Sequence, residues 1–155
     1  IKLSRLGFAV TLCAPEMRKV NIGLVGCGTV GSGVVKGLAR NGALMGSRLG
    51  VRFSLGGVAV RNPRKARAAR LSRGLVTSDW ESLVRDPKID VVMELMGGTT
   101  TARKVVAEAL KLGKPVITAN KALTSAHGAS IFRLAEKDGG NLCYDASVAG
   151  GIAII

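Results

Sequence analysis

Three glycines after a short apolar run have the spacing that most clearly suggests chemistry in this sequence. Gly26, Gly28 and Gly31 follow the apolar stretch 20–25 at the spacing G-x-G-x-x-G, and an apolar pattern of helical period comes next. At this spacing the first glycine makes a tight strand-to-helix turn, the second lets a diphosphate approach the backbone, and the third lets helix and strand pack closely. Phosphates then bind the N–H groups at the positive end of the helix. The stretch predicts a dinucleotide site; a plain glycine turn without a ligand is the alternative.

Arg61 occupies a position that bears on which dinucleotide binds. Sites that prefer NAD usually carry an acid at the end of the second strand, where it holds the ribose 2′-hydroxyl. Arg61 stands there instead, followed by Arg64 and Lys65. A guanidinium can pair with a 2′-phosphate through two hydrogen bonds, which favours NADP, with NAD still possible. The alternative is a surface arginine in a basic segment.

Further polar residues follow the later predicted strands. Lys121 is expected to end a strand and to face the ligand crevice, where a lysine can hold a carboxylate or move a proton, although most lysines are simply solvated. Asn120 either orients that site or turns the chain. Glu94 serves the same crevice or caps the helix that begins near Thr99, and the sequence does not decide between them. His127 is expected to be a surface or core residue rather than a catalyst.

Strands and helices alternate along the chain and must position these residues. The expected strands are 20–25, 51–60, 89–93, 116–119 and 142–146, and the expected helices are 29–41, 79–85, 100–112 and 125–137. The second of these strands is expected to end at 58–60 and to have a bulge or a late start at its two glycines. Ser78 and Glu81 have the spacing of a capping box for the second helix. This alternation predicts an α/β fold with a Rossmann-type, doubly wound parallel sheet. In such a sheet ligands bind beyond the carboxyl ends of the strands, which is where the polar candidates fall.

Length and composition exclude several other classes of protein. The chain has 155 residues, room for one domain, and its 47% hydrophobic residues include no run near the ~18 that a membrane span needs. We therefore expect a soluble protein without a membrane partner. The net charge of +13 includes an acid-free basic stretch, 52–73, that would suit nucleic acid. With only 3% aromatic residues and no recognised nucleic-acid module, no nucleic-acid partner is expected.

The cysteines and the first residues bear on location. Cys13, Cys27 and Cys143 are odd in number and lack a metal-ligand pattern, which suggests reduced thiols in the cytoplasm. Residues 1–16 differ from the rest, and Met17 offers a natural start. We expect 1–16 to be a leader, disordered or non-native, with a targeting peptide as the weaker alternative, and 17–155 to be the NAD(P)-binding domain.

Four motifs in order along the chain resemble the homoserine dehydrogenase family. They are GLVGCGTVGSGV, VVMELMGG, GKPVITANKAL and YDASVAGGI. The resemblance implies NAD(P)-dependent interconversion of L-homoserine and L-aspartate 4-semialdehyde, in the pathway to threonine, methionine and isoleucine. It also implies a homodimer formed through a catalytic domain that this chain lacks. A truncated chain of this kind is expected to bind NADP weakly without turnover.

The resemblance also implies roles for individual residues. Pyrophosphate would bind at Gly26, Gly28, Thr29, Val30 and Gly31, the 2′-phosphate at Arg61, and the nicotinamide side near Gly97, Gly98 and Thr99. Lys121 matches a lysine that contacts cofactor and substrate and is implicated in catalysis. Some members bind a monovalent cation such as Na⁺ at the positions of Asp145, Val148, Gly150 and Ile152. The family usually has Glu at the first of these, and Pro is common where Ala153 stands, so the departures weaken the cation prediction. A stand-alone dinucleotide-sensing module without catalysis is the alternative function.

Overall fold

The computed structural model describes residues 17–63 and 71–144 of the chain. The predicted leader 1–16, the basic turn residues Arg64 and Lys65, and the end of the last predicted strand lie outside these residues. So do the four positions predicted for the cation, Asp145, Val148, Gly150 and Ile152. The fold that follows is that of the described part.

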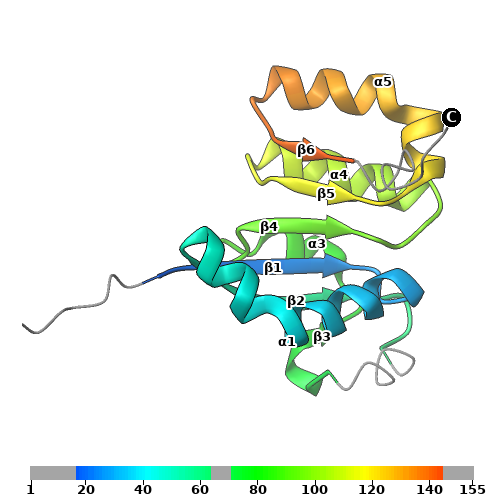
Figure 1. The fold of residues 1–155 in the computed structure, drawn as a ribbon. Coiled ribbons are helices and arrows are strands. Elements are labelled where there is room, and N and C mark those ends of the chain that lie inside the picture. Colours follow the sequence, from blue (N-terminus) through cyan, green and yellow to red (C-terminus); the bar gives the residue numbers. More distant parts are fainter. Residues whose placement is uncertain (1–16, 64–70, 145–155) are drawn as a thin grey trace, which may run out of the picture.

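Six parallel strands form one sheet in the order β3-β2-β1-β4-β5-β6 (Figure 1). The strands are β1 (Arg18–Val25), β2 (Val51–Ala59), β3 (Val76–Thr77), β4 (Val91–Glu94), β5 (Val116–Thr118) and β6 (Leu142–Cys143). Strand β1 lies in the middle of the sheet, β2 and β3 follow on one side of it, and β4, β5 and β6 follow on the other. This confirms the predicted Rossmann-type parallel sheet, and the change of direction lies between β1 and β4.

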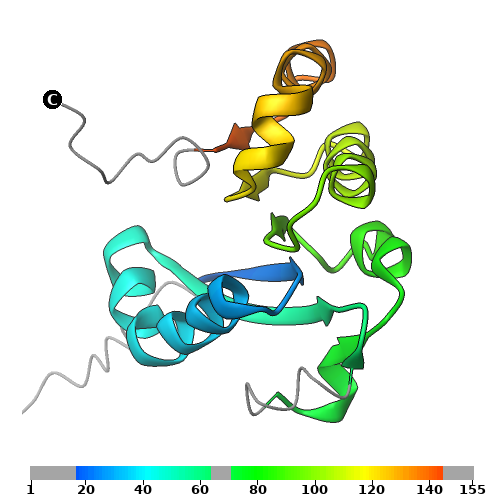
Figure 2. The ribbon, with the colours of Figure 1, turned by 90° about the vertical axis from the view of Figure 1, so that its right-hand side faces the viewer.

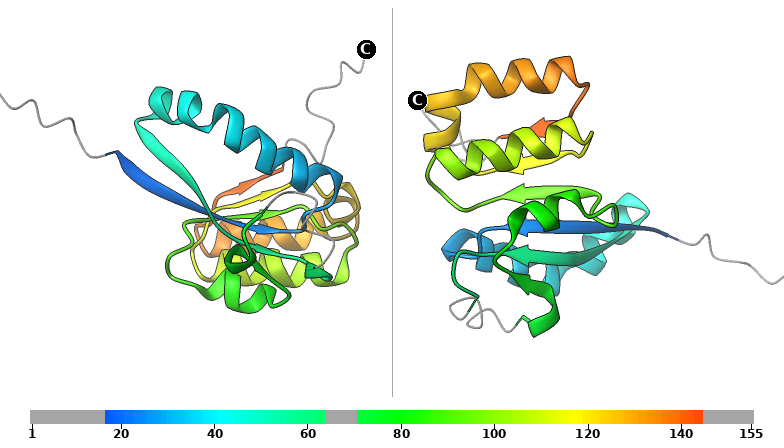
Figure 3. Two further views of the ribbon diagram at one scale, coloured as in Figure 1. Left: turned by 90° about the horizontal axis from the view of Figure 1, so that it is seen from below. Right: turned by 180° about the vertical axis from the view of Figure 1, so that it is seen from behind.

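Helices cover both faces of the sheet (Figures 2 and 3). Helix α1 (Thr29–Leu49) lies over β1 and β2 on one face. On the other face α3 (Trp80–Arg85), α4 (Thr100–Lys111) and α5 (Lys121–Lys137) follow one another, with α4 packed against both neighbours. A short 3₁₀ turn, η2 (Arg73–Leu75), leads into β3. Right-handed crossovers between parallel strands require this division, because the direction of strand addition reverses after β3.

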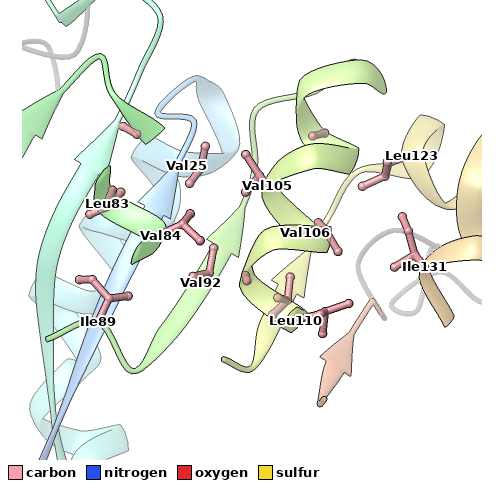
Figure 4. Packing of buried hydrophobic residues seen from close by; sticks show 14 of the residues in the cluster. Val25, Leu83, Val84, Ile89, Val92, Val105, Val106, Leu110, Leu123 and Ile131 are labelled. Atoms are coloured by element: carbon pink, nitrogen blue, oxygen red, sulfur yellow. The ribbon is translucent and has the colours of Figure 1, made fainter. Parts of the chain in front are cut away.

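The buried core lies between the sheet and the helices α3, α4 and α5 (Figure 4). Its side chains are aliphatic, as the shortage of aromatic residues predicts; Val84, Val92, Val105, Val106 and Leu110 have no exposed surface at all. The buried residues of α4 recur at three- and four-residue intervals, which keeps one stripe of the helix on the sheet. Each fully buried valine or leucine contributes about 1.5–3 kcal/mol relative to an exposed one. The buried strands therefore hold the first residues of the loops that follow them in place.

The prediction that the first helix ends near residue 41 is wrong, because α1 continues to Leu49. Gly42 and Gly46 suggested a connecting loop, yet both lie inside the helix. A side chain at Gly46 would collide with the carbonyl oxygen of Val51 at the start of β2. That glycine therefore permits close packing of the helix on the strand, and the helix ends at Gly50, whose φ is +67°.

Two other boundaries differ from the predictions in instructive ways. Helix α3 is capped by Asp79, whose carboxylate accepts a hydrogen bond from the Ser82 amide at 3.0 Å, so Ser78 is not the cap. Helix α5 begins at Lys121, four residues earlier than predicted, because the Asn120 side chain caps it. The glycines of the second strand do form a bulge: the register with β1 shifts between Leu55 and Gly57.

Lys114 connects α3 to the loop before β5. Its ammonium donates hydrogen bonds to the carbonyl oxygens of Val84 and Asp86 at 2.7 and 2.6 Å, at the end of α3. Burial lowers the pKa of Lys114, while the carboxylates of Asp86 and Asp90 act in the opposite direction. The lysine thus satisfies carbonyls that a helix end leaves without partners.

Candidate functional site

The turn between β1 and α1 is built around two glycines that no other residue could replace without movement. Gly26 has a φ of +99°, its amide donates to the Ala59 carbonyl at 2.8 Å, and an added Cβ would lie 2.5 Å from the Met96 Cα. A Cβ on Gly31, which is buried, would collide with the carbonyl oxygen of Gly26. The first glycine thus makes the turn and the third lets α1 approach β1, as their spacing predicts.

Gly28, between them, is different because it faces open space. It is exposed, a Cβ added there would meet nothing within 4 Å, and it is the N-cap of α1 without a side chain to cap the helix. The amides of the first helical turn, including those of Thr29 and Val30, have no acceptor within the helix. The first turn also contains no acidic residue. This end of α1 therefore offers free N–H donors and a positive helix terminus to an anion.

A cavity of about 660 Å³ opens beside this turn, at the carboxyl ends of β1, β2 and β4. It is lined by residues of the glycine turn and by the residues that follow the neighbouring strands: Val25, Gly26, Cys27, Gly28, Ala59, Val60, Arg61, Asn62, Ser78, Trp80, Leu95, Met96 and Thr101. The volume is in the range of cofactor and small-molecule sites. Arg61 is exposed at the end of β2, where a cofactor's adenosine ribose binds in folds of this type.

Several of these lining residues were not predicted from the sequence. Ser78 and Trp80 come from the start of α3, and Thr101 from the first turn of α4. Thr101 lies just after the glycines that follow β4, so its position beyond a strand end was a signal that could have identified it. Nothing in the sequence indicates that Trp80 lines the cavity, because its place there depends on how α3 packs.

The Gly97–Gly98 turn lies between β4 and α4, directly after the cavity-lining residues Leu95 and Met96. Both glycines adopt left-handed conformations, with φ of +75° and +71°, and are exposed. Thr99 is the N-cap of α4, although its side chain makes no capping hydrogen bond. Neither glycine nor Thr99 lines the cavity described above, so the turn lies next to the cavity and is not part of its lining.

Glu94 is fully buried at the end of β4 and does not cap α4. Its carboxylate accepts hydrogen bonds from the Met96 amide at 2.9 Å, the Thr118 hydroxyl at 2.7 Å and the Asn120 side-chain amide at 3.4 Å. The Asn120 amide also donates to the Gly98 carbonyl at 2.7 Å. These bonds link the ends of β4 and β5 to the Gly97–Gly98 turn. Of the two roles that the sequence left open for Glu94, the capping of the helix near Thr99 is wrong, and Glu94 does not line the cavity either.

Lys121 is the first residue of α5 and is exposed, so the prediction that it ends a strand is wrong. Strand β5 ends at Thr118, and Asn120 accepts the hydrogen bond from the Leu123 amide that starts the helix. Lys121 and His127 are both absent from the lining of the cavity. The structure therefore brings the glycine turn and Arg61 together and places Lys121 beside the Gly98–Asn120 contact.

The described part of the chain contains no group of three or more His, Cys, Asp or Glu residues placed to hold a metal ion. Cys27 and Cys143 are free thiols. Within the same residues, no helix is long and apolar enough to cross a membrane.

The parallel sheet, its strand order and the glycine turn at the head of α1 define a dinucleotide-binding domain of the Rossmann type. The family model described as the homoserine dehydrogenase NAD binding domain matches residues 26–145. The chain belongs to the homoserine dehydrogenase family.

Relatives and solved structures agree with this assignment. Homoserine dehydrogenases of Pseudomonas aeruginosa and Neisseria gonorrhoeae are 39% and 42% identical to this chain, over 90% of it and 32% of their own length. The crystal structure of a homoserine dehydrogenase from Thiobacillus denitrificans has a TM-score of 0.79 and 39% identity, covering 85% of this chain and 30% of that one. A Staphylococcus aureus structure of the same enzyme has a TM-score of 0.81 and 38% identity, covering 90% and 35%. The chain spans about a third of the length of the curated relatives it matches.

Proposed function

We propose that this chain is the part of a homoserine dehydrogenase that binds NADP, for the interconversion of L-homoserine and L-aspartate 4-semialdehyde by hydride transfer. One observation carries the proposal. Side chains at Gly26 and Gly31 would collide with the protein itself, whereas Gly28 between them opens onto free space beside a cavity. A turn built in this way leaves room for a diphosphate against the backbone.

The residues present fit a dinucleotide. The amides of Thr29, Val30 and Gly31 would hold the pyrophosphate at the N-terminus of α1, as in other sites of this geometry. Gly97, Gly98 and Thr99 would lie along the nicotinamide half. When bound, the reduced cofactor would donate a hydride to the semialdehyde and the oxidised cofactor would accept one from homoserine. The chain would bind and orient the cofactor.

Arg61 supports NADP rather than NAD. It lines the cavity at the end of β2, where an NAD site would carry an acid. Its guanidinium would pair with the 2′-phosphate through charge-assisted hydrogen bonds. A fold neighbour with 18% identity and a TM-score of 0.65, a hyperthermophilic archaeal homoserine dehydrogenase, is described in complex with NADPH, and it supports a nicotinamide dinucleotide as the ligand class.

Lys121 is proposed as the catalytic residue of this chain, holding the substrate's polar groups next to the nicotinamide. A lysine in the first turn of a helix is unfavourable by a few tenths of a kcal/mol, because its charge meets the positive end of the helix dipole. Residues that break such local rules are often functional. The monovalent cation at Asp145, Val148, Gly150 and Ile152, the cytoplasmic location and a homodimer formed through a further domain remain proposals from the family resemblance.

The chain on its own is proposed to bind NADP weakly and not to turn over substrate, since it spans only about a third of the length of its relatives. A dinucleotide sensor without catalysis is the alternative. A polypeptide of the relatives' full length that includes this chain, mixed with aspartate 4-semialdehyde and NADPH, separates the two functions. NADPH oxidation supports the dehydrogenase, and binding without oxidation supports the sensor.

The cofactor preference is tested by Arg61→Glu, with Arg52→Glu as the matched control. Both exchanges make the same charge change on or directly after β2, and Arg52 is exposed and does not line the cavity. Loss of a charge-assisted hydrogen bond costs about 1.5–3 kcal/mol, so Arg61→Glu should weaken NADPH binding about 10- to 150-fold and leave NADH binding nearly unchanged. Unchanged NADPH affinity, or an equal loss in the control, contradicts the role of Arg61.

A further inference from the structure

A carboxylate buried without a positive partner requires an explanation. Glu94 has no exposed surface, and no ion pair to it exists among the described residues. Burying a charge is costly unless hydrogen bonds compensate it, and here the Met96 amide, the Thr118 hydroxyl and the Asn120 amide do so. An aliphatic residue at the end of β4 would have filled a core position more simply. The bonds that the carboxylate organises are therefore of interest.

Asn120 is the residue that this carboxylate orients. Its Oδ1 accepts from the Leu123 amide at 3.1 Å, which caps α5 and decides which end of the side-chain amide is oxygen. Its Nδ2 then points at the Gly98 carbonyl, 2.7 Å away, and at Glu94. The Asn120 backbone amide donates to the Thr118 hydroxyl at 3.1 Å, which itself donates to Glu94. One side chain thus joins the Gly97–Gly98 turn to the first turn of α5.

This contact fixes the direction of a peptide group in the turn. In a trans peptide the carbonyl and the N–H point to opposite sides. Since the Gly98 carbonyl points at Asn120, the Thr99 N–H of the same peptide group points away from Asn120. Both glycines have positive φ and are exposed. Because neither has a side chain, the turn is not held by side-chain contacts of its own. Asn120 supplies that restraint from outside.

We propose that Glu94 and Asn120 are positioning residues that set the Gly97–Gly98 turn and Lys121 relative to each other across the nicotinamide half of the site. The proposal rests on the proposed function, because it assigns the nicotinamide end to this region. Neither residue lines the cavity beside Arg61 and Gly28. Glu94 does accept from the amide of Met96, which lines that cavity, whereas Asn120 bonds to the Gly97–Gly98 turn and to the first turn of α5. We therefore expect their main effect at the nicotinamide half of the dinucleotide.

Two variants separate this role from simple stabilisation. Glu94→Gln keeps the shape of the side chain but replaces one carboxylate oxygen by an NH₂ group, which cannot accept. Either the Met96 and Asn120 amides or the Thr118 hydroxyl then lose their acceptor. Asn120→Ser retains a good helix cap for α5, yet is too short to reach Gly98. Asp90→Asn is the matched control: its carboxylate accepts from the Asn21 amide at 2.7 Å, just before β4 and at the opposite end of the sheet.

The test follows backbone amide signals by NMR while the chain is titrated with NADPH and, separately, with adenosine 2′,5′-bisphosphate, which lacks the nicotinamide half. Both ligands should bind to the unaltered chain and to all three variants through the Gly28–Gly31 turn, with less than a twofold change in affinity for the bisphosphate. In Glu94→Gln and Asn120→Ser, the shifts that NADPH causes at Thr99 and Lys121 should fall at least severalfold. Asp90→Asn should retain them.

Each other result has a defined meaning. If the unaltered chain binds neither ligand, the proposed function fails first, and the positioning role fails with it. If it binds both and the two variants keep their NADPH shifts at Thr99 and Lys121, the positioning role alone is refuted. Equal weakening of both ligands in the variants also refutes it, because a merely structural contribution would act on the whole site.

Discussion

Exchange of Gly28 for alanine should separate the binding site from the fold. A Cβ at this position meets no protein atom within 4 Å, and the backbone there has a φ of −79°, which alanine accepts without strain. The added methyl group projects into the space proposed for the diphosphate. Gly33→Ala is the matched control, since Gly33 also has nothing within 4 Å but lies on the exposed surface of α1, away from the cavity.

The expected magnitudes differ between folding and binding. Alanine is a poorer helix cap than glycine, so Gly28→Ala should cost about 1 kcal/mol of stability or less. Crowding a well-packed contact by one methyl group costs about 1–3 kcal/mol, which corresponds to about a 5- to 150-fold loss of NADPH affinity. Gly33→Ala should stabilise the chain by up to about 1 kcal/mol through helix propensity and leave the affinity unchanged.

The single tryptophan provides the assay. Trp80 lines the cavity and is the one tryptophan in the sequence. When NADPH binds, energy transfer from Trp80 to the reduced nicotinamide should quench the tryptophan fluorescence. Titrations and thermal melts of the unaltered chain and both variants give affinity and stability together. If Gly28→Ala binds NADPH as tightly as the unaltered chain, the diphosphate does not rest on this turn and the reasoning is wrong.

Three further exchanges test the framework, each measured by thermal or urea unfolding. Gly31→Ala forces a Cβ against the Gly26 carbonyl oxygen and should destabilise the chain by about 1–3 kcal/mol or prevent the turn from forming; a stable variant would contradict the close approach of α1 to β1. Lys114→Met removes the two hydrogen bonds to the end of α3 and should lower the free energy of unfolding by about 1–3 kcal/mol; an unchanged value would contradict a stabilising role of these bonds. Asp79→Ala removes the cap of α3 and should cost about 1 kcal/mol, whereas Ser78→Ala, predicted as the cap from the sequence but not acting as one, should cost less.

The sequence predicted the parts of the fold that depend on local chemistry. The glycine turn after β1 and the end of the predicted helix 100–112, directly before Gly113 with its φ of +69°, follow from conformations that only glycine adopts easily. The alternation of apolar strands with helical patterns was sufficient to predict the parallel sheet. Arg61 was correctly placed at the end of the second strand because strand ends are marked by a change from apolar to polar residues.

Features that depend on distant contacts could not be predicted in the same way. Gly46 looked like a helix breaker, and only its approach to Val51 shows why a helix needs glycine there. Strand β3 has two residues and exists through its pairing with Val58 and Ala59, so no local pattern marks it. The buried bonds of Glu94 depend on β5 lying beside β4, and the sequence alone left its role open.

The central claim is that a dinucleotide's diphosphate binds the main-chain amides at the head of α1. The most direct measurement is the shift of every backbone amide signal of the unaltered chain on titration with NADPH. The account predicts saturable shifts that are largest at Gly28, Thr29, Val30 and Gly31, with a second group at Gly97, Gly98 and Thr99. Saturable shifts confined to other parts of the chain, or none at any NADPH concentration, would contradict it.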